Sequence, residues 1–173
     1  VYLTPRGSHG TGDFTARDWG KSPMPQYADG SPALGSDGKQ SGWGFGLMQL
    51  DWSIYPDWLR ANQWWDPAVI IPKGLEELKK HVAFFSASGA GKTVTLSTDA
   101  ASRREVTAGT YPDPRPLIGD DLWRAALAAY NGGDTNVLRS IAVGKDPDMT
   151  TTGKNYSMAV MTKAVALSQK LMA

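Results

Sequence analysis

The run LWRAALAAY at residues 122–130 constrains the fold more than any other stretch, because it is small and apolar nearly all round a helical period. A helix of this composition must be buried against several neighbours rather than along one face. Asp120 and Asp121 stand near its start, where negative charge favours the helix dipole. Asn131, Gly132 and Gly133 follow as a stop signal. We therefore expect a buried helix over residues 117–130 at the centre of a mainly α domain.

Further helices are predicted by apolar residues that recur at helical spacing. The expected ranges are 73–85, with Pro72 where a first-turn proline is tolerated, 98–106, 135–143 and 155–171. In the last of these, one apolar stripe is expected, formed by Tyr156, Val160, Ala164, Leu167 and Leu171. No stretch has a convincing strand pattern. In the helix 73–85, Glu76 is expected to pair with Lys80, and His81 is expected to be a surface residue.

Glycine and proline divide the chain into two parts. Residues 1–46 contain ten glycines and four prolines and lack a helical period, so we expect a loop-rich segment over 1–45. Residues 46–173 form the predicted helical body. At 173 residues and 41% hydrophobic composition, the whole chain is expected to be one globular domain, 1–173, with its own core.

Charge and composition exclude several classes of function. The net charge is +1 and the basic residues are scattered, so nucleic acid is not an expected partner. No apolar run approaches the ~20 residues that a membrane span requires. There is no cysteine, and the two histidines lie far apart, so no metal site or cofactor is expected. Gly91-Lys92-Thr93 imitates a phosphate-binding loop, but Ser86 stands where its first glycine is required.

The run GWGFGLMQLD at residues 42–51 is the first candidate for a binding site. Glycine at every second position leaves the main chain open to a ligand lying close against it. Gln49 stands between apolar anchors, either as a solvated loop amide or as a hydrogen-bond partner placed for a ligand. The seven tryptophans include side chains available to stack on sugars or bases.

Polar residues also stand at the ends of two predicted helices. Tyr130 and Asn131 end the buried helix, and Tyr156 begins the last one. Each has a purely structural explanation, since a tyrosine at a helix end commonly binds backbone and an asparagine before two glycines commonly caps a helix. Taken singly, these residues do not assign a function.

Taken together, three motifs resemble a known family. GLMQLD at 46–51, AAYNGG at 128–133 and then Tyr156 are similar, in order and context, to the motif series of goose-type lysozymes and soluble lytic transglycosylases. The resemblance covers about residues 10–166. One departure is Gly132, where those proteins usually carry alanine. The resemblance implies a lysozyme-like fold that binds β-1,4-linked N-acetylhexosamine chains, chiefly peptidoglycan and less so chitin.

The resemblance also implies which residues contact the glycan. Met48 and Gln49 would contact the acetamido sugar beside the scissile bond, and the Tyr156 hydroxyl would orient the catalytic acid. An uncharged polysaccharide is held by such amide and hydroxyl groups together with stacking. The implied substrate-binding residues are Gly46, Met48, Gln49, Tyr130, Asn131 and Tyr156.

The family's catalytic glutamic acid has no counterpart in this chain. That residue precedes the Gly-Leu-Met-Gln loop, whereas Glu76, Glu77 and Glu105 all follow it. The alignment places the acid and its helix before Val1, so we expect an upstream or separate segment to complete the core. The catalytic residue is therefore unknown, and Asp37 and Asp51 are the candidate auxiliary carboxylates.

Two functions of different classes follow. One is a cell-wall glycosidase or transglycosylase, active if a glutamate upstream of Val1 or a substitute carboxylate completes the site. The other is a catalytically inactive lectin for N-acetylglucosamine polymers on the same fold. A structural or phage-tail domain that merely engages the wall is a third possibility. Whether the chain is an enzyme stays open, and the expected location is extracellular, periplasmic or cell-wall associated.

Overall fold

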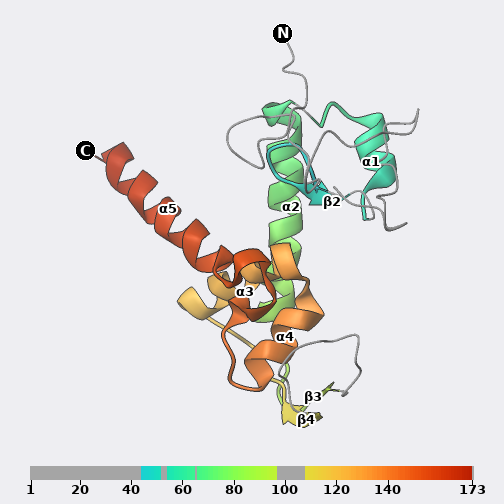
Figure 1. Cartoon of the computed structure of the whole chain (residues 1–173), viewed down its shortest axis with the longest axis vertical. Helices are drawn as coiled ribbons and strands as arrows, with labels where there is room; N and C mark the ends of the chain where they lie inside the picture. The colour runs from blue at the N-terminus through green and yellow to red at the C-terminus, as the bar shows by residue number, and fades with distance from the viewer. Residues whose placement is uncertain (1–43, 52–53, 65, 97–107, 173) are drawn as a thin grey trace. The chain divides into compact units, whose positions relative to one another are not determined.

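The computed structural model describes residues 44–51, 54–64, 66–96 and 108–172 (Figure 1). The chain divides into two compact units, Val1–Glu76 and Glu77–Ala173, each described here by itself. The described part is mainly helical, which confirms the α class. The lysozyme-like fold stays a prediction. Asp37 and the predicted helix 98–106 lie outside the described residues.

The first unit contains a small hairpin, a short helix and the beginning of a long helix. Strands β1 (Gly44–Phe45) and β2 (Leu50–Asp51) are antiparallel, with Gly44 opposite Asp51 and Phe45 opposite Leu50. Helix α1 spans Pro56–Ala61 and α2 spans Pro67–Ser86. The apolar core of this unit consists of Leu50, Leu59, Trp64 and Ile70, with Met48, Tyr55 and Trp58 packed against it.

Helix α2 begins six residues before the predicted start at residue 73. Asp66 caps it, because its Oδ1 accepts the Ala68 backbone N–H at 2.8 Å, and Pro67 occupies the first helical position. Pro72 therefore lies inside the helix and not in its first turn. There it removes the hydrogen bond that residue 72 would donate to the carbonyl of Ala68. Asp66 and Pro67, not Pro72, therefore mark the beginning of α2.

The second unit is organised around α3 (Gly119–Gly132), as the small apolar run predicted. Its alanines 125, 126, 128 and 129 are all buried, and the helix contacts α4 (Asp134–Ala142) and α5 (Tyr156–Met172). Two 3₁₀ segments, η2 (Pro147–Thr150) and η3 (Thr152–Lys154), connect α4 to α5. The core cluster consists of Phe85, Ala125, Ala128, Ala129, Val137 and Leu138.

The expectation of no strand is wrong. Strands β3 (Thr93–Leu96) and β4 (Gly109–Pro112) form an antiparallel pair in the second unit, with Val94 opposite Tyr111 (Figure 1). Each strand has only four residues, too few for a period of two to stand out in the sequence. Leu96 is buried and Thr93 and Thr95 are exposed, so the alternation is present once the pairing is known.

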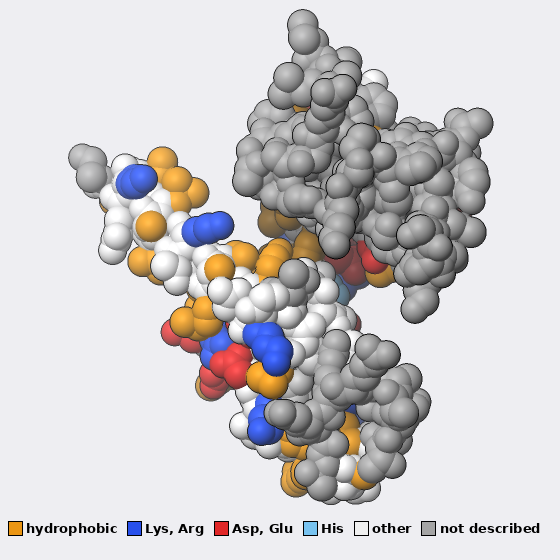
Figure 2. Space-filling model, viewed as in Figure 1, with side chains coloured by type: hydrophobic (Ala, Val, Ile, Leu, Met, Phe, Trp, Pro, Cys, Tyr) orange, Lys and Arg blue, Asp and Glu red, His pale blue; other side chains and the backbone are white. Residues whose placement is uncertain are grey.

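Helix α5 does not bury the stripe that its sequence predicts. Ser157, in its first turn, is buried, whereas Leu167 is 58% exposed and Leu171 is 78% exposed. Figure 2 shows hydrophobic side chains interleaved with basic ones along this helix. Only the beginning of α5 therefore belongs to the described core. None of the helices seen in the described ranges combines the length and the apolar character needed to cross a bilayer.

Candidate functional site

The Gly-Leu-Met-Gln run forms the tight turn that joins β1 to β2. The Gln49 backbone N–H donates to the Gly46 carbonyl at 3.1 Å, and its side-chain Nε2 donates to the same oxygen at 2.7 Å. Gly46 and Gln49 both have positive φ, +66° and +50°. Glycine adopts this conformation freely, but for glutamine it is uncommon and strained. Such strain is concentrated at functional sites, so the turn is the first candidate.

Met48 within the turn and Asp51 just after it make further contacts. Met48 is half-buried against the core of the first unit, and a Cβ built on Gly74 would lie 2.5 Å from the Met48 Cε. Glycine at position 74 therefore makes room for the methionine. Asp51 follows in β2, and its carbonyl accepts the backbone N–H groups of Ile54 and Tyr55 at 3.1 and 3.0 Å. Met48 thus packs into the core of the first unit, and the Gln49 amide is bonded within the turn itself.

Tyr130 and Asn131 lie in the last turn of α3. The helix continues to Gly132, and its cap is Gly133, with φ +81°. Asn131 therefore lies inside the helix, where it is exposed, and the explanation that it caps the helix is wrong. Tyr130 is half-buried, and its ring packs edge to face against His81 with centroids 6.0 Å apart. Both side chains remain at the end of a rigid helix, as predicted.

His81 is not the surface residue that the sequence predicts. It is only 9% exposed, and its Nδ1 lies 2.8 Å from Oδ1 of Asp134 in α4. Its Nε2 lies 3.8 Å from Oε1 of Glu77, one turn earlier in α2. The spacing of four residues in a helix indicates that Glu77 lies near His81. Asp134, however, is 53 residues from His81 in sequence, and no local pattern connects them. Sequence reasoning therefore missed this cluster.

Tyr156 begins α5 beside a buried carboxylate that the sequence did not single out. Asp148 in η2 is 1% exposed and accepts the Ser157 hydroxyl at 2.7 Å and the Ser157 N–H at 2.8 Å. Burial raises the pKa of Asp148, but hydrogen bonds from Ser157, Met158 and Thr151 together hold it below its ordinary value. Asp148 thereby fixes the first turn of α5. Burial alone raises the pKa of the Tyr156 hydroxyl.

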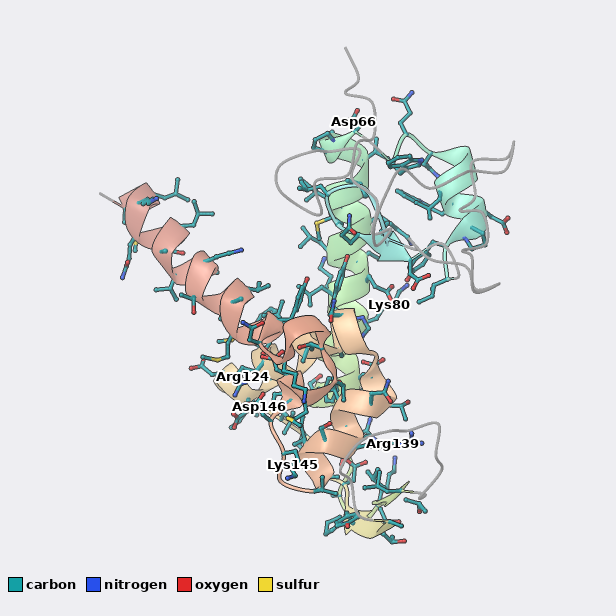
Figure 3. The ribbon with its side chains drawn as sticks, viewed as in Figure 1. Asp66, Lys80, Arg124, Arg139, Lys145 and Asp146 are labelled. Carbon is teal, nitrogen blue, oxygen red and sulfur yellow. The ribbon has the colours of Figure 1, made fainter. Side chains whose placement is uncertain are left out.

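A shallow cavity of about 390 Å³ lies elsewhere in the second unit. It is lined by Leu117, Asp121, Arg124, Ile141, Gly144, Lys145, Asp146 and Pro147. Arg124 and Asp146 lie side by side in Figure 3, and both Asp146 oxygens accept from Arg124 Nη2 at 2.8 Å. This ion pair already engages the guanidinium, and no predicted glycan-binding residue lines the cavity. The cavity is thus separate from the predicted site.

The predicted site residues divide between the two units. Gly46, Met48, Gln49 and Asp51 share the hairpin of the first unit, and Tyr130, Asn131 and Tyr156 share the contacting helices α3 and α5 of the second. Within the described ranges, no group of three His, Asp or Glu side chains is arranged to hold a metal ion. Comparison of the chain with known protein families, with curated proteins and with solved structures finds no match.

Proposed function

We propose that this chain binds β-1,4-linked N-acetylhexosamine polysaccharide, chiefly peptidoglycan and less so chitin. The single observation that carries the proposal is the strained turn. A glutamine held at positive φ, with its amide tied to the Gly46 carbonyl, occupies the position where the motif resemblance expects a sugar contact. Glycine or asparagine is the usual residue at such a φ, so a glutamine held there supports a binding role.

The second unit supplies independent support. The half-buried Tyr130, the exposed Asn131 and the half-buried Tyr156 stand at the ends of two packed helices. Side chains at the ends of rigid elements suit the recognition of a neutral glycan, which needs a few fixed polar groups and an aromatic face.

Cleavage is the conditional part of the proposal. Glycoside hydrolysis needs a carboxylic acid to protonate the leaving oxygen. The chain is an enzyme if a glutamate upstream of Val1, or a substitute carboxylate such as Asp37 or Asp51, completes the site. The alternative is a catalytically inactive lectin for N-acetylglucosamine polymers. Either protein would work outside the cytoplasm, in the periplasm or at the cell wall, with the glycan as its partner.

Calorimetric titration with a chitin oligosaccharide, together with sedimentation on purified peptidoglycan, tests binding. We expect wild type to bind both and a Gln49→Gly/Tyr130→Ala double variant to bind neither. Absence of binding to both glycans by the folded wild-type chain would refute the proposal. Mass spectrometry of the soluble products then distinguishes an enzyme from a lectin. An enzyme releases muropeptides with an added water or an anhydro end, whereas a lectin releases none.

A further inference from the structure

A histidine lies between two carboxylates directly against the ring of Tyr130. We propose that His81 is a positioning residue for Tyr130, and that it acts through a protonation-dependent bridge between Glu77 and Asp134. The inference deepens the proposed function and rests on it, because Tyr130 is one of the side chains expected to contact the glycan. It adds a regulation by pH that neither the motifs nor the proposed activity contain.

The geometry assigns the protons on the ring. A carboxylate only accepts, so the 2.8 Å contact with Asp134 requires a proton on Nδ1 of His81. In the neutral imidazole, Nε2 is then a lone-pair acceptor, and it faces the Glu77 carboxylate at 3.8 Å. Two acceptors that face one another repel. Protonation of Nε2 turns this repulsion into attraction and draws the ring toward Glu77, one turn earlier on the same helix, while Nδ1 keeps its contact with Asp134 in α4.

Charged groups surround the ring on the elements packed against it. On α2, Glu77 also accepts from Lys80 at 2.8 Å, through its other oxygen. On α4, Asp134 interacts electrostatically with Arg115, which is itself paired with Asp113 at 2.7 Å. On α3, Tyr130 faces the ring without a charge at neutral pH. The surroundings of the ring thus contain three carboxylates and two cations. A positive charge on His81 brings the formal sum of these charges to zero.

The edge-to-face contact transmits this change to the predicted sugar site. The two rings lie at 75°, with centroids 6.0 Å apart, so a shift of the imidazole toward Glu77 must move the Tyr130 ring or loosen its packing. Tyr130 is half-buried and Asn131 follows it in the last turn of α3. The orientation of this helix end therefore depends on the charge of His81.

The first test is an NMR pH titration of the free chain, which needs no ligand. We expect the Tyr130 ring resonances, assigned with Tyr130→Phe, to move in step with the His81 Cε1–H between about pH 5 and pH 8, where histidine titrates. In His81→Asn, which keeps a donor toward Asp134 but cannot titrate, the Tyr130 signals should stay constant. His9→Asn, which removes the only other histidine, should behave as wild type.

The second test measures affinity for a chitin oligosaccharide over the same pH range. We expect wild type and His9→Asn to show a common change in affinity of about threefold to tenfold, a coupling typical of a two-state element, and His81→Asn to show none. If His81→Asn does not fold, Glu77→Gln replaces it, and the Tyr130 shift should shrink.

These tests distinguish failure of the positioning role of His81 from failure of the proposed function. Tyr130 resonances that ignore the titration of His81, or that move equally in His81→Asn, would overturn the positioning role whatever the chain binds. An unchanged pH profile of affinity in His81→Asn would do the same. Tyr130 signals that follow His81 in a chain that binds no glycan would instead uphold the bridge and refute the proposed function.

Discussion

Ser157 donates its hydroxyl to the buried carboxylate of Asp148 at 2.7 Å and its backbone N–H to the same carboxylate at 2.8 Å. The backbone N–H of Met158 donates to this carboxylate as well, at 3.3 Å. Asp148 therefore satisfies N–H groups at the start of α5, where negative charge also favours the helix dipole. This carboxylate therefore helps to fix the turn that carries Tyr156, whose own N–H donates to Thr151 Oγ1 at 3.4 Å.

Replacing Asp148 by asparagine should destabilise the second unit. The amide has one acceptor oxygen and would turn its NH₂ group toward backbone donors, which leaves buried polar groups unpaired. We expect Asp148→Asn to lower the free energy of unfolding by about 2–4 kcal/mol, measured by urea denaturation.

The matched control is Asp146→Asn. Asp146 caps η2 by accepting the Asp148 backbone N–H at 2.8 Å, and asparagine caps equally well. Only the partly exposed ion pair with Arg124 is weakened, so the expected loss is about 0–1 kcal/mol. Equal losses in the two variants would contradict the special role of Asp148.

Acid should unfold wild type through the same carboxylate. The pKa of Asp148 is lower in the folded chain than its ordinary value of 3.8, so its contribution is complete above that value and is lost as the pH falls through the folded pKa. We expect stability to decline below about pH 4. Asp148→Asn should flatten this decline, measured by denaturation across the acid range. A further component should remain from Asp113, whose pKa is lowered chiefly by the hydrogen bond from Arg115.

Gly132→Ala should destabilise the chain although alanine is the better helix former. A Cβ at position 132 would lie 2.7 Å from Thr150 Oγ1 and 3.1 Å from the Thr150 carbonyl oxygen. The overlap costs about 1–3 kcal/mol and outweighs a propensity gain of up to about 1 kcal/mol. Thermal unfolding should show a lower Tm.

Thr150→Ala tests the cause of that loss. Thr150 Oγ1 is buried without a hydrogen-bond partner among the described residues, so its removal should be nearly neutral. In the Gly132→Ala/Thr150→Ala double variant, part of the lost stability should return. Strictly additive effects would show that the threonine hydroxyl is not the obstacle.

Gln49 offers a test that separates binding from folding. Glycine relieves the strain at φ +50° but loses the side-chain hydrogen bond to Gly46, so Gln49→Gly should leave Tm within a few degrees of wild type. Affinity for a chitin oligosaccharide should fall about tenfold, the equivalent of one lost hydrogen bond of about 1.4 kcal/mol.

Gln49→Asn is the comparison variant, because asparagine tolerates positive φ and keeps a shorter amide. Its affinity should lie between wild type and Gln49→Gly. If both variants bind as tightly as wild type, the strained turn has no role in glycan recognition.

The helices of the second unit were predictable because their signals are local. The expected ranges 117–130, 135–143 and 155–171 correspond to α3, α4 and α5 within two residues at each end. Apolar spacing, glycine stops and first-turn aspartates act between residues a few positions apart. The predicted start of α2 is six residues late, because Pro72 fits a first-turn proline in the sequence, whereas Asp66 caps the helix and Pro67 begins it.

The sequence by itself determined the α class and the buried alanine-rich helix. Only the tertiary structure decided that His81 is buried, that Asp148 anchors α5 and that the far end of α5 is exposed. Those outcomes depend on partners such as Asp134, 53 residues from His81. Local propensity carries no information about contacts at such separations, because the same polar residue is stable in solvent or buried beside a partner.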